Sequence, residues 1–130
     1  MANVIDFDEL LENSKQNRLK DERELKIFSQ YQKVFDESNL NWTPDGMYND
    51  IFLRYNENYI NDLLRARGYV FLNDVYEVLG LSKTVEGQVV GWIHNPNVRG
   101  QIQFEIWCNT EQHYIVIDFN VEGFIFDKVF

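Results

Sequence analysis

The sequence predicts an α+β domain in which helices come first and an antiparallel sheet follows. Between residues 47 and 68, apolar side chains recur every three or four positions, the spacing of a helix buried on one face. After Gly91 the spacing changes to alternation of apolar and polar residues, which is typical of half-buried strands. We therefore expect N-terminal helices, two long and one short, followed by a three- to four-stranded antiparallel meander with the helices on one sheet face.

The chain of 130 residues fits a single domain, 1–130. Its expected parts are an N-terminal helical arm, 1–38; a helical pair, 47–81; and an antiparallel sheet, 88–130. Within the arm, an apolar stripe that ends at Val34 and Phe35 predicts a helix over residues 6–37.

The next helix is the clearest in the chain. A turn made by Pro44, Asp45 and Gly46 precedes it, and Gly68 ends it after two arginines that suit the negative end of a helix. Its apolar side is expected to face the core: Tyr48, Ile51, Phe52, Tyr55, Tyr59, Ile60, Leu63 and Leu64. The three tyrosines are compatible with a stacking platform for bases or rings, but their helical spacing among Ile and Leu favours a core and its rim.

The segment LNDVYEVLGL reads as a short helix with both ends specified. Asn73 is expected to cap its start, and Asp74 suits the positive end of the helix. Gly80 is expected to adopt the left-handed conformation that ends a helix, with Leu81 folding back onto it.

The strands near the C-terminus alternate apolar and polar side chains. Pairing Phe104 with Ile115, and Ile102 with Ile117, keeps the aliphatic side chains on one face, whereas a slip of one residue would expose them. Residues 108–112 are expected to form the turn between these strands. Two further strands are expected: 89–93 and 124–129.

Several short motifs resemble a known family. They are LNDVYEVLGL, GQVVGW, and IDFNV followed by FIFD, with NDIFLRYNENYINDLLRARGY ahead of them. Together they are similar to the C-terminal region of a phage-encoded family of unknown function from viruses of Gram-positive bacteria, over roughly residues 45–130. The resemblance implies a phage protein in the cytoplasm of the infected host. Longer family members carry membrane-type segments, which this chain lacks, and the family supplies no catalytic residues.

The charge balance bears on the partner. With 21 acidic and 12 basic residues, the formal net charge is −9, which disfavours direct nucleic-acid binding. Such a charge favours basic partners, including the nucleic-acid channels of other proteins, although ordinary solubility explains it equally well. No apolar run has the length of a membrane span and the N-terminus lacks a signal peptide, so we expect no membrane contact.

Catalytic and metal-binding chemistry has little support in the sequence. Cys108 is the single cysteine and clusters with neither His94 nor His113, so no zinc site, cofactor or disulfide is expected. Three carboxylates could converge on Mg²⁺: Glu105, Asp118 and Asp127. Alternation places the first two on the face opposite the aliphatic residues, where carboxylates are common in any case.

The outer face of the sheet is the predicted interaction site. Its residues combine aromatic, aliphatic and acidic side chains: Glu105, Trp107, Tyr114, Val116 and Asp118. Aromatic residues ringed by acids are typical of an interface for a basic partner, unless the N-terminal helix covers this face.

We therefore expect a non-enzymatic, acidic phage protein that acts by protein–protein interaction and inhibits a host or anti-phage defence protein, with nucleic-acid mimicry as one route. The alternative is a virion-associated or assembly component. A metal-dependent enzyme is the third reading.

Overall fold

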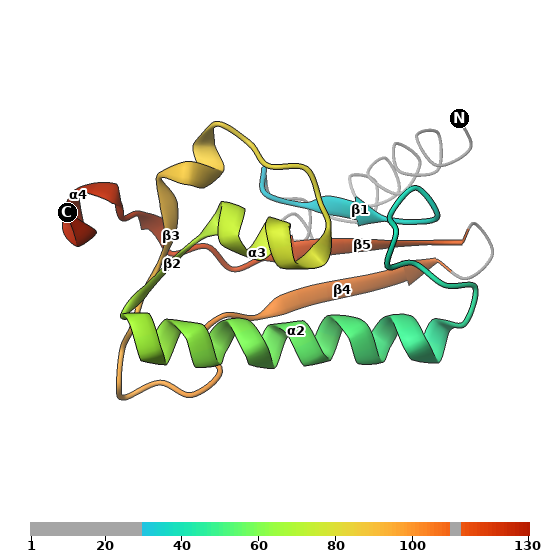
Figure 1. Ribbon diagram of the computed structural model, residues 1–130, viewed down its shortest axis with the longest axis horizontal. Coiled ribbons are helices and arrows are strands. Elements are labelled where there is room, and N and C mark those ends of the chain that lie inside the picture. Colours follow the sequence, from blue (N-terminus) through green and yellow to red (C-terminus); the bar gives the residue numbers. More distant parts are fainter. Residues whose placement is uncertain (1–29, 110–112) are drawn as a thin grey trace, which may run out of the picture.

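A computed structural model describes residues 30–109 and 113–130 (Figure 1). Its elements are, in chain order, β1 (Lys33–Phe35), α2 (Gly46–Arg67), β2 (Tyr69–Phe71), α3 (Leu72–Leu79), the 3₁₀ turn η2 (Glu86–Gln88), β3 (Val90–Ile93), β4 (Phe104–Asn109), β5 (Tyr114–Phe119), β6 (Gly123–Phe124) and α4 (Phe126–Val129). The described strands form two antiparallel sheets, ordered β1-β5-β4 and β2-β3-β6. The α+β class is confirmed. The single meander after the helices is not, because β1 precedes α2 and β2 lies between α2 and α3.

The first sheet is built around β5, whose six residues are all buried. Phe104 pairs with Phe119 and Cys108 with Ile115, so the predicted pairing of Phe104 with Ile115 was wrong by four residues, although it kept the correct face. The physical reason is the hairpin turn. His113 adopts a φ of 62° and donates its N–H to the carbonyl of Asn109 at 2.9 Å, which closes the hairpin there.

The predicted helix over 6–37 is wrong at its end, where Lys33–Phe35 form β1, and residues 1–29 lie outside the described part. Pairing with β5 satisfies the backbone of this segment. Phe35 is fully buried and its ring stacks on that of Phe52 at 5.7 Å, which holds β1 against α2.

The predicted end of α2 at Gly68 is confirmed, whereas its start lies at Gly46, a residue that was predicted to belong to the preceding turn. Asp45 accepts the N–H of Met47 at 2.9 Å, and Gly68, with a φ of 95°, donates to the Leu64 carbonyl at 2.8 Å. The predicted core face is wrong in part, since Tyr48, Ile51, Tyr55 and Tyr59 are exposed. The buried side of the helix consists instead of Asn49, Leu53, Asn56, Ile60, Asn61 and Leu64.

Hydrogen bonds of their side-chain amides explain why asparagines, and not the tyrosines predicted there, lie on the buried side of α2. Asn49 donates to the Thr43 carbonyl at 2.8 Å and accepts the Thr43 N–H at 3.0 Å, so it fastens the preceding loop to the helix. Asn56 donates to the Phe52 carbonyl at 2.9 Å. Burial costs these amides little because each has its hydrogen-bond partner.

The helix α3 ends as predicted and begins differently. Leu81 donates to the Tyr76 carbonyl at 2.8 Å and Gly80, at a φ of 74°, donates to that of Glu77 at 3.1 Å, which is a Schellman motif. At the start, the N–H of Phe71 is accepted by the Asp74 carboxylate at 2.9 Å rather than by a side chain at 73.

Asn73 was expected to cap α3 and instead binds the loop that follows this helix. It donates to the Thr84 carbonyl at 2.9 Å and accepts the Thr84 N–H at 3.0 Å. A Cβ on Gly87 would lie 2.2 Å from the Asn73 amide oxygen, so only glycine fits beside this contact.

The predicted last strand, 124–129, is also wrong. β6 contains only Gly123 and Phe124, and the N–H groups of Ile125 and Phe126 both turn to the Val89 carbonyl, at 2.9 and 3.2 Å. Two donors on one carbonyl curl the chain into α4 instead of extending it.

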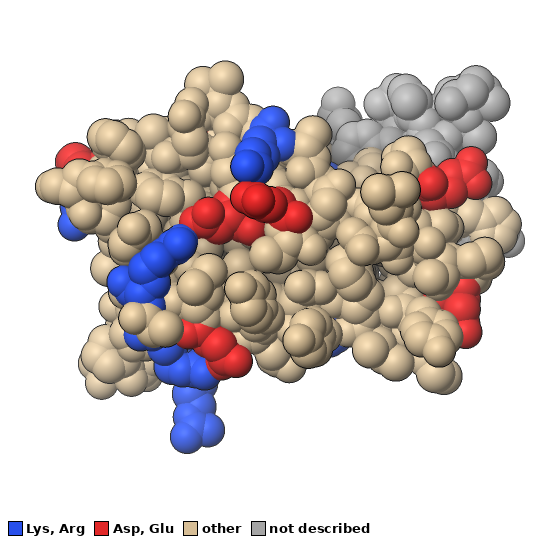
Figure 2. Space-filling model, viewed as in Figure 1, with Lys and Arg blue, Asp and Glu red and all other residues tan. Residues whose placement is uncertain are grey.

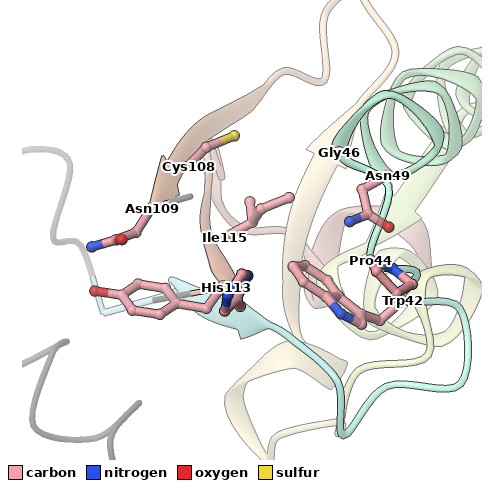
Figure 3. A pocket seen from close by; sticks show the side chains of 9 residues that line it. Trp42, Pro44, Gly46, Asn49, Cys108, Asn109, His113 and Ile115 are labelled. Carbon is pink, nitrogen blue, oxygen red and sulfur yellow. The ribbon is translucent and has the colours of Figure 1, made fainter. Parts of the chain in front are cut away.

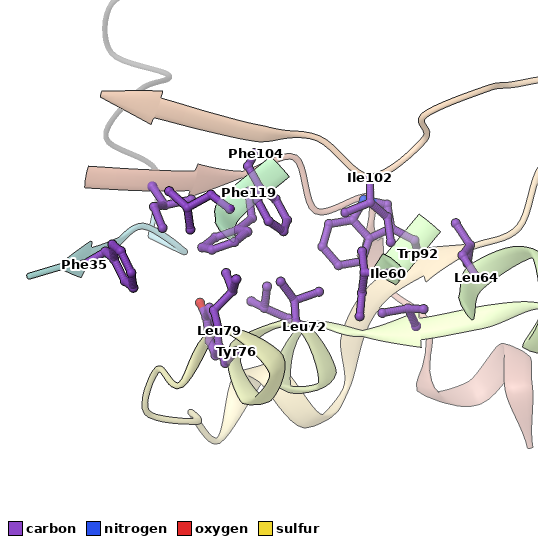
Figure 4. Close-up of a cluster of buried hydrophobic side chains, with 14 of the residues drawn as sticks. Phe35, Ile60, Leu64, Leu72, Tyr76, Leu79, Trp92, Ile102, Phe104 and Phe119 are labelled. Atoms are coloured by element: carbon purple, nitrogen blue, oxygen red, sulfur yellow. The ribbon is translucent and has the colours of Figure 1, made fainter. Parts of the chain in front are cut away.

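One core joins the two sheets (Figure 4). Trp92 of β3 is fully buried in this core, and its indole N–H donates to the Asn120 carbonyl at 3.1 Å. Tyr76 of α3 meets the Phe119 ring edge to face at 5.5 Å. Both helices therefore pack on the same face of the first sheet, and the opposite face carries the residues predicted to form the site.

Candidate functional site

The five predicted interaction residues do share one sheet face. Glu105 pairs with Asp118 and Trp107 with Val116, while Tyr114 pairs with Asn109. Their exposure differs from the prediction, because Tyr114, Val116 and Asp118 are buried, with exposed fractions of 1%, 1% and 5%. Glu105 is exposed and Trp107 is half-buried. The alternative, that the N-terminal helix covers this face, concerns residues outside the described part.

The outer edge of β4 offers a more accessible feature. Just before this strand, the Asn61 side chain donates to the Ile102 carbonyl at 2.9 Å and accepts the Ile102 N–H at 2.9 Å. These are the two hydrogen bonds that a neighbouring strand would form with the same residue. A side chain of α2 thus takes the place of a strand.

The next outward-facing residue, Phe104, is held in the same way. The Glu57 carboxylate accepts its N–H at 2.7 Å, and the Arg54 guanidinium donates to its carbonyl at 3.3 Å. Arg54 and Glu57 also form an ion pair at 3.1 Å, which orients both groups toward the strand. Side chains of α2 therefore cap the edge at two successive positions.

Beyond Phe104 no side chain of the described residues caps this edge. Backbone groups of an antiparallel strand alternate in direction, so those of Ile106 and Cys108 point outward as those of Ile102 and Phe104 do. No hydrogen bond to the outward groups of Ile106 or Cys108 is found within residues 30–109 and 113–130. Exposed strand edges of this kind pair readily with another chain. We call these two positions the open edge.

The space beside the open edge widens toward the end of β4. The capping side chains lengthen from Asn61 through Glu57 to Arg54, so α2 and β4 diverge in that direction. At the near end is a cavity of about 300 Å³ lined by the capping residues, Gln103 and Glu105. The other end, between the start of α2 and the end of β4, holds a second cavity.

This second cavity has a volume of about 180 Å³ (Figure 3). Trp42, Pro44 and Ile115 supply apolar walls, while Cys108 and His113 supply polar atoms. From the sequence alone one cannot tell that Cys108 and His113 line one cavity, because their separation depends on the register of the hairpin between them. A small apolar side chain would fit here.

The Cys108 thiol in the second cavity lacks the lowered pKa of an activated nucleophile. Partial burial and the nearby Asp50 carboxylate raise the pKa of the Cys108 thiol, whereas a nucleophilic cysteine needs a lowered pKa. His94 lies elsewhere, at the end of β3, where its N–H donates to the Gly68 carbonyl.

Among the residues that the structure describes, no three His, Cys, Asp or Glu side chains are grouped to hold a metal ion. In the same part of the chain, no helix has the length and apolarity needed to cross a membrane. Figure 2 shows Lys and Arg interspersed with Asp and Glu on the face it presents, rather than gathered into one patch.

Comparison with known proteins gives a family and no activity. A family model described as "Family of unknown function (DUF6353)" matches residues 5–129. Neither the curated proteins nor the solved structures contain a match.

Proposed function

The chain belongs to the DUF6353 family, whose function is unknown, and we propose from its own surface that it binds a partner protein without catalysis, by adding an extended segment of that partner to the open edge of β4. The observation that carries the proposal is the contrast along one edge. Ile102 and Phe104 are capped by α2, while Ile106 and Cys108 offer two N–H and two C=O groups. Strand addition takes its affinity from such backbone groups and its selectivity from alternate side chains.

The surroundings of the open edge define the partner segment. Successive side chains of an extended segment point to opposite sheet faces. On one face they would meet the cavity beside Cys108 and Trp42, and on the other they would meet Glu105 and the half-buried Trp107. A segment with a small apolar residue and a neighbouring basic residue fits both, and the net charge of −9 supports a basic partner.

The biological setting is proposed from the resemblance and the acidic charge. The chain is phage-encoded, acts in the cytoplasm of the infected bacterium and inhibits a host or anti-phage defence protein. A virion-associated or assembly component is the alternative, and finding the protein in purified particles would favour it.

The test begins with a displayed library of random peptides, selected on the wild-type protein. Selected peptides are then measured against Cys108→Pro and Cys108→Val by fluorescence polarisation. Proline removes the outward N–H of residue 108, which belongs to no bond within the sheet, whereas valine keeps it. We expect binding to weaken at least about tenfold in the proline variant and to persist in the valine variant. Equal binding by both variants, or selection of no peptide, would overturn the proposal.

Two further measurements locate the bound peptide. Amide hydrogen exchange at Ile106 and Cys108 should slow on binding, because both N–H groups gain acceptors. Glu105→Lys should weaken the binding of peptides that carry a basic residue. Added salt should reduce the difference in affinity between the wild type and this variant. Protection confined to other strands would contradict the proposed geometry.

A further inference from the structure

The side of α2 that faces away from the core carries a line of large apolar side chains, which we call the tyrosine stripe: Tyr48, Ile51, Tyr55 and Tyr59. Their exposed fractions are 64%, 56%, 68% and 46%. The spacings of three and four place them along one helix face. Figure 2, in the view of Figure 1, shows the surface over the middle of α2 without Lys, Arg, Asp or Glu. Scattered apolar residues are ordinary on a surface, but an aligned group marks an interaction site.

We infer that two copies of this chain associate through the tyrosine stripe, with their α2 helices antiparallel. This interface uses another face of the molecule than the open edge of β4 and stands apart from the function proposed above.

Charge selects a second copy as the occupant. Each chain carries a formal charge of −9, so two copies repel unless they meet where acids are absent. The four side chains of the stripe are uncharged, and Arg54 and Glu57 of the same helix are bonded to Phe104. Asp62, which follows Tyr59 on this face, is already paired with Arg65 of its own chain, so it offers a basic partner little.

The two ends of α2 favour the antiparallel arrangement. Asp45 caps its start, while Arg65 and Arg67 in its last turn are paired with Asp62 and Asp74 of the same chain. The arrangement therefore depends on the helix dipoles, which oppose each other when the two helices are antiparallel. A two-fold axis near Tyr55 then brings this residue against itself in the second copy.

The area is sufficient for a weak dimer. If a large side chain has a surface of about 200 Å², the exposed surface of the four stripe residues is roughly 500 Å² on one copy. Two copies would then bury about 1,000 Å² in total. That total lies near the lower bound of specific interfaces, so the association should depend on concentration.

Sedimentation equilibrium over about 5 to 500 µM measures the association directly. Wild-type protein is expected to move from monomer to dimer in this range, and Tyr55→Glu should raise the dissociation constant at least about tenfold. The matched control is Val85→Glu, which adds the same charge at a side chain that is 82% exposed and lies outside α2. It should associate like the wild type. Circular dichroism verifies that both variants fold.

A cross-linking experiment tests the symmetry. In a Cys108→Ser background, Tyr55→Cys should form a disulfide-linked dimer on mild oxidation, and Val85→Cys should not. A wild-type protein that stays monomeric throughout the range, or Tyr55→Glu associating as tightly as the wild type, would overturn the inference. So would a stripe occupied only by a different protein. Cys108→Pro should leave the dimer unchanged, so failure of this inference and failure of strand addition are distinguishable.

Discussion

Asn61 and Ile102 are joined by two hydrogen bonds of 2.9 Å, although 41 positions separate them in the sequence. Ile102 is fully buried and Asn61 is 8% exposed, so both bonds are largely sheltered from water. This pair fixes the distance between α2 and the segment that enters β4.

Replacing Asn61 by alanine should therefore be strongly destabilising. Two buried backbone groups of Ile102 would lose their partners, and we expect the free energy of unfolding to fall by about 2 to 4 kcal/mol. Equilibrium unfolding in urea measures the change. Asn58→Ala, on the exposed side of the same helix, serves as the control and should cost less than about 0.5 kcal/mol. Equal midpoints for the two variants would show that the amide of Asn61 is dispensable.

Gly80→Val should disturb the end of α3. At a φ of 74° a β-branched residue is strained, and a Cβ would lie 2.8 Å from the Asn41 amide nitrogen. We expect a loss of about 1 to 2 kcal/mol from the backbone strain, with the contact adding to it. Gly46→Ala is the matched control, because a Cβ there meets nothing within 4 Å. A melting temperature that falls equally in both variants would contradict the special role of position 80.

Tyr76 should make stability depend on alkaline pH. Its hydroxyl donates to the Tyr31 carbonyl at 2.9 Å, and burial, followed by the Asp118 charge, raises its pKa well above the ordinary value. Below about pH 10 the residue is neutral in both states and stability is unaffected. Above that pH only the unfolded chain ionises, so the free energy of unfolding falls by up to about 1.4 kcal/mol per pH unit.

Urea titrations between about pH 9 and 11 check this expectation, with Tyr76→Phe as the comparison. The phenylalanine variant loses one hydrogen bond and should be less stable at neutral pH. Above about pH 10 its free energy of unfolding should also fall less steeply with pH than that of the wild type. The difference in slope should correspond to about one proton fewer released on unfolding. Identical slopes would mean that Tyr76 titrates normally in the folded protein.

Cys108 should react with alkylating reagents more slowly than other accessible thiols do. Its pKa is raised by partial burial and by the Asp50 charge, so the thiolate fraction at about pH 8 is small. Asp50→Asn removes the charge and should speed the reaction with iodoacetamide. Asp127→Asn, in α4 at the opposite end of the molecule, should leave the rate as it is in the wild type. No acceleration in Asp50→Asn would assign the slow reaction to burial alone.

The features that the sequence predicted correctly depend on neighbouring residues. The end of α2 at Gly68 and the end of α3 at Gly80 follow from side-chain and backbone chemistry within one turn. Alternation likewise placed Glu105 and Trp107 on the same strand face. Such local rules need no knowledge of the fold.

The features that it missed depend on distant partners. Apolar spacing alone predicted that Tyr55 would be buried and Asn61 exposed. Asn61 can be buried because it forms two hydrogen bonds with Ile102, and a residue so far away in the sequence does not enter the helical spacing. The open edge was invisible for the same reason, since the open positions are those that α2 side chains leave uncapped. The strand β1 also needs β5 to exist, because three residues carry too little pattern to be distinguished from a helix end.

The pairing of β1 with β5 also sets the order of events during synthesis. Lys33 leaves the ribosome early and its partner Ile117 leaves late, so β1 waits on the order of 10 s for its neighbour at ordinary translation rates. The α2–β2–α3 segment can form meanwhile, since its contacts are local. During that interval the apolar Val34 and Phe35 have no sheet to join, and a chaperone that shields short apolar segments would find them there. The first sheet is therefore completed only after β5 has left the ribosome, because β5 lies between β1 and β4.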